Sequence, residues 1–203
     1  MTLLDRPLTY TEVGATAGQL PDGYNHLRVH RVIGHGESTF RRAAERLMSW
    51  QMHRAAGLTV AATTPRIEQD SRVHLRLGWH LLRISFGCQV VYVVEEERQR
   101  GFAYGTLQGH PEQGEERFCV EWREDDAVVF TITAFSRPGT WWSRVLAPIS
   151  HRLQQRYTHR YLHALQRPFE RRRACATGTH PGAPCEEMTP RAANSSPRTS
   201  DRR

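Results

Sequence analysis

The sequence predicts an α+β domain in which a curved antiparallel sheet of about six to seven strands grips a long C-terminal helix, a helix-grip arrangement. Apolar and polar residues alternate through most of residues 72–136, with turn-forming residues about every 8–12 positions, as in a meander of antiparallel strands. After Pro138 and Gly139 the apolar spacing changes to three and four residues, which is typical of an amphipathic helix. A flat α+β sandwich with its helices stacked on one face is the alternative.

The segment before the meander predicts one strand and one helix. Residues 24–33 alternate loosely and end at the Gly-His-Gly turn of residues 34–36, so they are expected to form a strand. Residues 38–55 have helical apolar spacing. Ser38 is the expected N-cap of this helix, and Gly57 lies at the left-handed position just beyond its end.

Further short segments alternate or form the continuous apolar runs typical of strands. They are residues 58–63, 73–77, 81–86, 88–94, 102–106, 118–122 and 128–134. The expected connections are a charged turn at 95–100, a polar loop at 108–115 and an acidic turn at 124–126. Because successive side chains of a strand point to opposite faces, the alternation predicts a sheet with one buried face.

The chain after the last strand predicts the helix that the sheet would hold. Apolar residues recur at helical steps from Trp142 to Leu165. Pro148 is expected to kink or divide this helix, and Pro168 to end it. The histidines at 151, 159 and 163 are interpreted as surface residues, because no acidic partner accompanies them at a helical step.

The positive charge of the chain is concentrated toward its C-terminus. All 28 basic residues are Arg and the net charge is +7, and residues 171–203 hold seven of the Arg with three acidic residues, which is +4 of that total. With so few aliphatic residues, this stretch is predicted to be a disordered Arg-, Pro- and Ser-rich tail behind a single domain at residues 1–170. A basic tail can bind nucleic acid or an anionic membrane by charge alone, and the alternative is a solvated tail.

Several classes of protein are excluded by what the sequence lacks. No run approaches the roughly 20 apolar residues of a transmembrane helix, and Asp5, Pro7 and Glu12 interrupt any signal peptide. We therefore expect a cytoplasmic protein whose four Cys are reduced. The Cys spacing matches neither zinc nor disulfide patterns, and no P-loop, GxGxxG, GxSxG or HExxH motif occurs, so no metal and no cofactor are expected.

Residues 105–116 hold the densest group of polar side chains in the predicted domain. His110 is followed by carboxylates that include Glu115 and Glu116. An imidazole and a carboxylate are a common pair in general acid–base catalysis, so His110 with Glu115 or Glu116 forms the candidate catalytic set. The alternative is a glycine-rich hairpin connection whose charged residues only hold the turn.

Other residues are candidates for contact with a ligand. Arg137 lies at the corner between the last strand and the final helix, where it either forms an ion pair with a carboxylate of residues 115–116 or receives an anionic ligand group. Tyr104 and Trp142 belong to the aromatic residues that form the core, line a cavity, or do both. With His110 near the rim, the candidate ligand-binding residues are Tyr104, His110, Arg137 and Trp142.

The run GFAYGTLQGHPEQGEE, from Gly101 to Glu116, resembles the domain of unknown function 1990 family, also named uncharacterised protein family 0548. Further pieces that match this family are residues 8–10, 12–16, 34–36, 50, 52–53, 56–57, 118, 134–138, 156–157, 161–162 and 164–165. The resemblance covers about residues 8–167 and leaves the tail outside. The order of elements is similar to that of the polyketide cyclase and lipid-transfer superfamily of helix-grip folds, which implies an apolar cavity and no nameable catalytic residue.

The function expected from these observations is binding of a small hydrophobic or amphipathic molecule between the sheet and the final helix. One alternative is an enzyme of the same fold that uses His110 and a nearby carboxylate. Another is an interaction module that docks on nucleic acid or an anionic membrane through its basic tail.

Overall fold

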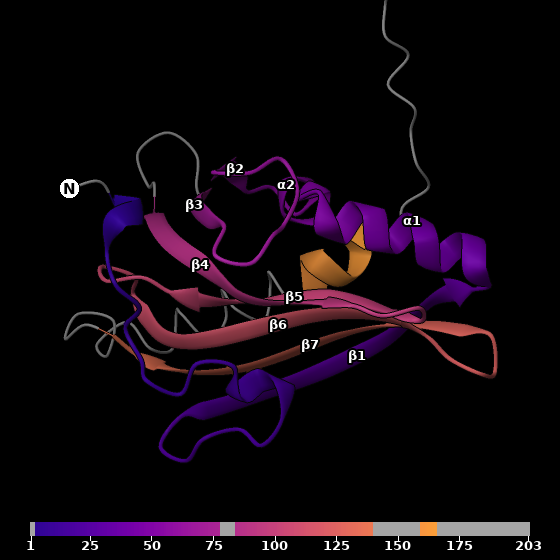
Figure 1. Ribbon diagram of the computed structural model, residues 1–203, viewed down its shortest axis with the longest axis horizontal. Helices are drawn as coiled ribbons and strands as arrows, with labels where there is room; N and C mark the ends of the chain where they lie inside the picture. Colours follow the sequence, from indigo (N-terminus) through magenta and orange to yellow (C-terminus); the bar gives the residue numbers. More distant parts are fainter. Residues whose placement is uncertain (1–2, 78–83, 140–158, 166–203) are drawn as a thin grey trace, which may run out of the picture. The chain divides into compact units, whose positions relative to one another are not determined.

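The computed structural model describes residues 3–77, 84–139 and 159–165. These residues form a seven-stranded antiparallel sheet with the order β1-β7-β6-β5-β4-β3-β2 (Figure 1). The strands are β1 (Asn25–His35), β2 (Thr59–Ala62), β3 (Arg72–Leu77), β4 (Ile84–Glu95), β5 (Gln99–Thr106), β6 (Glu112–Trp122) and β7 (Ala127–Pro138). β3 to β7 follow one another as a meander, and β1 closes the edge beside β7.

Three helical segments lie on one face of this sheet, which we call the inner face (Figure 1). They are α1 (Glu37–Met48), α2 (Gln51–Ala55) and the helical residues 159–165. α1 buries the apolar stripe that its spacing predicts, which includes Phe40, Ala44 and Leu47. Among the described residues, no helix combines the length and apolar character that crossing a bilayer requires.

The predicted fold class is confirmed: a curved antiparallel sheet carries helices on one face in a helix-grip arrangement. Register shifts in the β1–β7 and β4–β5 pairs, at Val32/Gly34 and Val90/Tyr92, are irregularities of the kind that bend a sheet. Of the predicted final helix, only residues 159–165 are described. Trp142, Pro148 and the tail at 171–203 lie outside the described residues.

The boundaries of several elements differ from the prediction. The polar loop at 108–115 is shorter, because β6 already begins at Glu112. The two runs at 81–86 and 88–94 belong, from Ile84 onward, to the single strand β4. Backbone hydrogen bonds with neighbouring strands decide these limits, and alternation along one strand does not reveal them.

The helix predicted at 38–55 is two helices, because the chain breaks at Trp50. Trp50 has φ of 60°, a left-handed conformation that is rare for a bulky residue. At the other end, α1 begins at Glu37 after Gly36, so Ser38 lies inside the first turn and is not the N-cap. Gly57, with φ of 94°, does adopt the left-handed conformation that its place after the helix predicts.

Replacement of Gly57 by alanine is expected to lower the free energy of unfolding by about 1 kcal/mol, because a Cβ is unfavourable at this φ. Gly57→Asn is the matched control and should lose less, since asparagine tolerates the left-handed conformation. Urea unfolding followed by circular dichroism measures both variants. Equal losses for Ala and Asn would contradict a backbone origin of the effect.

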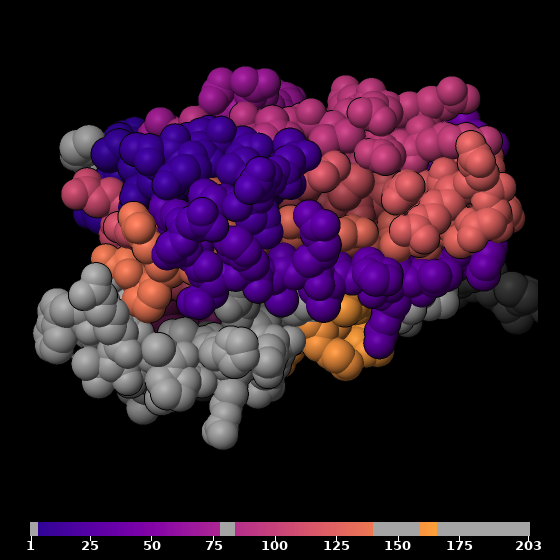
Figure 2. Space-filling view, turned by 90° about the horizontal axis from the view of Figure 1, so that it is seen from below, coloured from indigo at the N-terminus to yellow at the C-terminus, as the bar shows by residue number. Residues whose placement is uncertain are grey.

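The N-terminal segment, residues 3–24, covers part of the other face of the sheet, which we call the outer face (Figure 2). This segment, indigo in Figure 2, contains the short helical turns η1 (Leu3–Asp5) and η2 (Ala15–Ala17). Its Tyr10 ring packs edge-on against Phe135 with centroids 5.5 Å apart. The central strands are therefore buried on both faces, in contrast to the single buried face that alternation predicts.

Candidate functional site

The inner face of the central strands is unusually aromatic. Phe102 and Tyr104 of β5 alternate with outward residues, and Phe118 of β6 lies beside them. Adjacent rings in this group have centroids 5.4–5.9 Å apart. Since α2 and residues 159–165 cover the same face, the rings form the contact layer between sheet and helices (Figure 1).

His53 of α2 lies at the centre of this layer, with five aromatic rings around it. Its ring centroid is 5.4 Å from Trp50, 6.0 Å from Phe102, 5.9 Å from Tyr104, 5.4 Å from Phe118 and 5.2 Å from Tyr161. We call these six residues the His53 cluster. Burial, with a smaller contribution from the charge of Arg54, lowers the pKa of His53 to about 3, so the imidazole is neutral at physiological pH.

The polar atoms at the centre of the His53 cluster have no hydrogen-bond partner among the described residues. Both ring nitrogens of His53 and the indole Nε1 of Trp50 are buried and unpaired. A buried polar group without a partner costs about 1–3 kcal/mol. Protein cores contain few such groups, so three unpaired atoms at one place require a physical reason.

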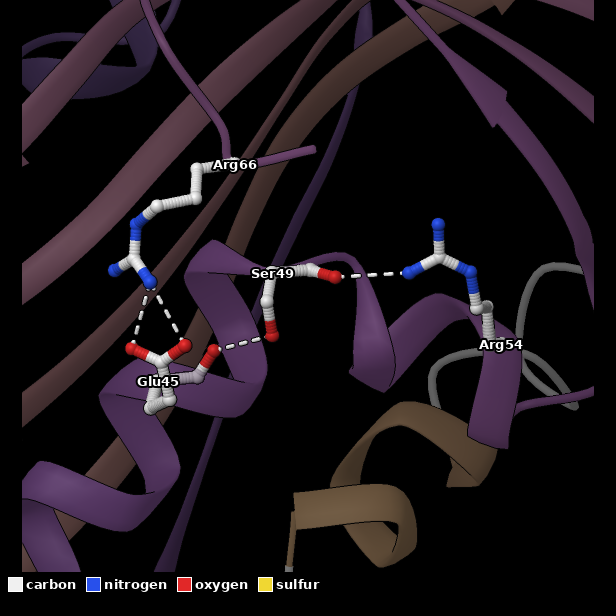
Figure 3. A network of polar contacts seen from close by, with 4 residues as sticks. All are labelled: Glu45, Ser49, Arg54 and Arg66. Carbon is white, nitrogen blue, oxygen red and sulfur yellow. Dashed lines mark hydrogen bonds and ion pairs between the residues drawn. The ribbon is translucent and has the colours of Figure 1, made fainter. Parts of the chain in front are cut away.

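A network of polar contacts fixes the junction that places Trp50 and His53 (Figure 3). Ser49 Oγ donates to the Glu45 carbonyl at 2.6 Å, and Arg54 Nη1 donates to the Ser49 carbonyl at 2.9 Å. Arg66 reaches both carboxylate oxygens of Glu45, at 2.8 and 2.9 Å. These contacts link the end of α1 to α2 across the left-handed Trp50, which belongs to the His53 cluster.

Glu116 lies on the inner face at the border of the His53 cluster and is hydrogen-bonded to one of its members, Tyr104. The two residues are opposite each other on β5 and β6, and Tyr104 Oη donates to Glu116 Oε2 at 3.0 Å. Burial raises the pKa of Glu116 to about 7, while the Tyr104 hydrogen bond opposes the shift and the charge of Glu112 adds to it. Burial also raises the pKa of Tyr104, which therefore remains a hydrogen-bond donor.

The candidate residues Glu115 and Glu116 point to opposite faces of the sheet, because they are neighbours on one strand. Glu115 faces outward and is buried beneath the N-terminal segment. It accepts hydrogen bonds from Tyr10 Oη at 2.7 Å, from the Gly14 amide at 2.7 Å, and from the amide and hydroxyl of Thr16. Its contacts are those of an anchor for that segment.

His110 lies in the β5–β6 connection, at the edge of the inner face. Its ring packs edge-on against Phe86 of β4 at 4.7 Å, and its Nδ1 accepts the Glu112 amide at 3.0 Å. Burial lowers the pKa of His110 to about 4. Catalysis by His110 with Glu116 stays a prediction, whereas Glu115 lies on the other side of the sheet.

The remaining candidates, Arg137 and Trp142, lie at the end of the last strand or follow it, and only Arg137 is among the described residues. Arg137 Nε donates to Gln113 Oε1 at 3.1 Å, and its guanidinium lies 4.5 Å from the ring centroid of Tyr24. Within the described residues Arg137 forms no ion pair with Glu115 or Glu116, because Glu115 bonds to the N-terminal segment and Glu116 points to the inner face. Trp142 lies outside the described residues.

A separate pocket of about 390 Å³ lies between α1 and the ends of strands β4–β6. Apolar side chains of Phe40, Met48 and Trp122 contribute to its lining, and charged residues surround them. Two of the charged pairs are already joined, Arg41 with Glu37 and Arg66 with Glu45. Within the described ranges, no group of three or more His, Cys, Asp or Glu side chains could hold a metal ion.

The family described as "Domain of unknown function (DUF1990)" matches residues 9–164. The chain belongs to this family. A UPF0548 protein of Deinococcus radiodurans is 36% identical over 172 residues, which cover 78% of this chain and 86% of that protein. A UPF0548 protein of Arabidopsis thaliana is 32% identical over 126 residues, covering 58% of this chain and 60% of its own length.

Solved structures show that this member of the DUF1990 family shares a wider fold. The hypothetical protein jhp0584 of Helicobacter pylori aligns with a TM-score of 0.55 and 9% identity, covering 78% of this chain and 94% of that one. The Zhui aromatase/cyclase of Streptomyces sp. R1128 aligns with a TM-score of 0.52 and 12% identity, covering 70% and 92%. At such low identity the likeness establishes the helix-grip fold alone.

The candidate site residues predicted from the sequence do not include His53 or Trp50. Trp50 and His53 match the family, but their spacing indicates only the end of a helix. A histidine at a helix end is usually a surface residue. The neighbouring sequence does not show that five aromatic rings, most of them from distant segments, surround His53. The sequence feature that points to this cluster is a tryptophan and a histidine close together at the end of one predicted helix.

Proposed function

We propose that this DUF1990 protein binds a small hydrophobic or amphipathic molecule against the inner face of its sheet, beside the His53 cluster. The observation that carries the proposal is the set of buried, unpaired polar atoms of Trp50 and His53 among aromatic rings. Pockets for small molecules combine a mostly apolar lining with a few polar groups in fixed positions. A ligand polar atom would pair with the groups that are now unpaired.

The inner face also keeps apolar surface that the helices do not fully cover. Leu27 and Val29 of β1, Leu77 of β3 and Phe86 of β4 pack against the core but remain partly exposed. In a closed core such residues would be fully buried, since each buried methylene contributes about 0.8 kcal/mol. The partial exposure supports a place for an apolar guest on this side of the sheet.

Two tryptophan substitutions on one strand test the proposal. Val29 and Val32 are both on β1, but Val29 is half-buried toward the inner face and Val32 is exposed on the opposite face. Val29→Trp is expected to weaken binding of the neutral probe N-phenyl-1-naphthylamine at least about tenfold, because the indole occupies ligand space. Val32→Trp should change the affinity by less than about twofold.

Probe fluorescence measures the affinities, and native mass spectrometry of the full chain shows whether a molecule co-purifies with it. Thermal unfolding of both variants confirms that they are folded. Failure of the folded wild-type protein to take up the probe, or an equal effect of the two substitutions, would refute binding at the inner face.

A further inference from the structure

We propose that the ligand is an organic amine, recognised by the carboxylate of Glu116 through its protonated nitrogen. The inference rests on the proposed function and specifies the chemical class of the ligand. Glu116 is an acidic residue of β6 that points to the inner face, where it contacts Tyr104 of the His53 cluster. The amine would carry an aromatic or aliphatic body that lies against the surrounding rings.

One carboxylate oxygen of Glu116 is fixed in position and the other is available. Oε2 accepts the hydroxyl of Tyr104 at 3.0 Å, which orients the carboxylate on the sheet. Oε1 has no hydrogen-bond partner among the described residues. The ion pairs formed within these residues join Arg41 to Glu37, Arg66 to Glu45 and Arg123 to Glu121, and none includes Glu116.

Among the described residues, no basic side chain forms an ion pair with Glu116. The residue opposite it on β7 is Ala134, and the next inward residue on β6 is Phe118. The imidazole of the cluster, His53, stays neutral because of its burial. A half-buried carboxylate without a cation is costly, so the site favours either a proton or a cationic ligand.

Aromatic rings around the carboxylate favour the cation over a neutral group. Tyr104 and Phe118 lie beside Glu116, and Tyr161 packs edge-on against Phe118 at 5.4 Å. Rings of this kind attract ammonium groups through their negative faces. The nearby charge of Glu112 acts in the same direction, because it also disfavours an anion at this place. A fatty acid or other carboxylate ligand would meet repulsion from the carboxylate of Glu116.

Three naphthalene probes of equal size test this assignment: 2-naphthylmethylamine, 2-naphthylmethanol and 2-naphthoate. Each displaces N-phenyl-1-naphthylamine from the full chain at pH 8, where a carboxyl with a pKa of about 7 is ionised. We expect the amine to bind at least about tenfold more tightly than the alcohol, and the carboxylate to bind most weakly.

The variant Glu116→Gln keeps the shape of the side chain and removes its charge. It should weaken amine binding at least about tenfold and change alcohol binding by less than about threefold. Glu121→Gln, on the outward side of the same strand, is the matched control and should change neither. Tyr104→Phe keeps the carboxylate, so the preference for the amine should survive in it.

The outcomes separate this inference from the proposed function. If the alcohol and the amine bind equally well, or Glu116→Gln leaves the preference unchanged, the amine assignment is wrong and ligand binding stands. If neither the naphthalenes nor N-phenyl-1-naphthylamine bind the folded wild-type protein, both proposals fail. Binding of the carboxylate above the amine would reverse the assigned charge of the ligand and also overturn the inference.

Discussion

Acidification is expected to destabilise this domain strongly through His53. Burial of the imidazole, with the charge of Arg54 as a smaller cause, lowers its pKa from 6.5 to about 3. Between these two values the unfolded chain binds a proton that the folded chain does not, so the free energy of unfolding falls as the pH falls. At about 1.4 kcal/mol per pH unit, the whole window removes about 5 kcal/mol, comparable with the total stability of many domains.

The variant His53→Leu isolates this effect, because leucine fills the site without a titrating group. Urea unfolding at pH 6.5, 5.5 and 4.5 measures the free energy of unfolding of the wild type and of the variant. For each unit by which the pH falls, the wild type should lose about 1.4 kcal/mol relative to the variant. His30→Leu, at an exposed position on β1, is the control for the replacement of a histidine by leucine outside the core. A difference for His53→Leu that stays constant over this range would show that the imidazole is hydrated or paired.

Glu116 changes the free energy of unfolding with pH in the direction opposite to His53. Its folded pKa of about 7 lies above the ordinary value of 4.5, so between these values the folded chain holds a proton that the unfolded chain has lost. Its contribution is therefore fully present below pH 4.5 and decreases as the pH rises toward 7. Between pH 4.5 and 6.5 Glu116 therefore opposes His53, whereas His110, whose pKa burial lowers to about 4, acts in the same direction as His53.

The fold could be predicted because its pattern is local. Alternation in β3–β7 follows from the pleat of each strand, and the turns between them carry their own residue signals. The same alternation shows that Glu115 and Glu116 must point to opposite faces, yet not which of them meets the helices. That assignment depends on the N-terminal segment, whose residues 3–24 show no periodic pattern and bind the outer face through non-local contacts.

The site was harder to predict, because it depends on contacts between distant parts of the chain. The break at Trp50 places a tryptophan in a conformation that glycine usually adopts, so residues 38–55 read as one helix. His53 meets Phe118 and Tyr161, which lie far along the sequence, only after the sheet has formed. Long-range packing of this kind leaves no signal in the spacing of neighbouring residues.

Replacement of Glu115 by alanine is expected to lower the free energy of unfolding by about 3–5 kcal/mol. The carboxylate is 2% exposed and accepts hydrogen bonds from Tyr10, Gly14 and Thr16. Its removal leaves these donors buried without an acceptor, each at a cost of about 1 kcal/mol or more. Gly105 allows the Tyr10 ring to lie close against β5, since a Cβ at this position would overlap that ring.

Urea unfolding gives the loss of stability, and hydrogen exchange shows where it arises. Amides of residues 9–17 should lose protection in Glu115→Ala, whereas the inner-face strands remain protected in the folded fraction. Glu121→Ala is the control on the same strand and face, because its ion pair with Arg123 at 3.6 Å is partly exposed and worth less than about 1 kcal/mol. A loss below about 1 kcal/mol for Glu115→Ala, with residues 9–17 still protected, would mean that apolar packing of Tyr10 on Phe135 holds the segment, and that the buried carboxylate is not its anchor.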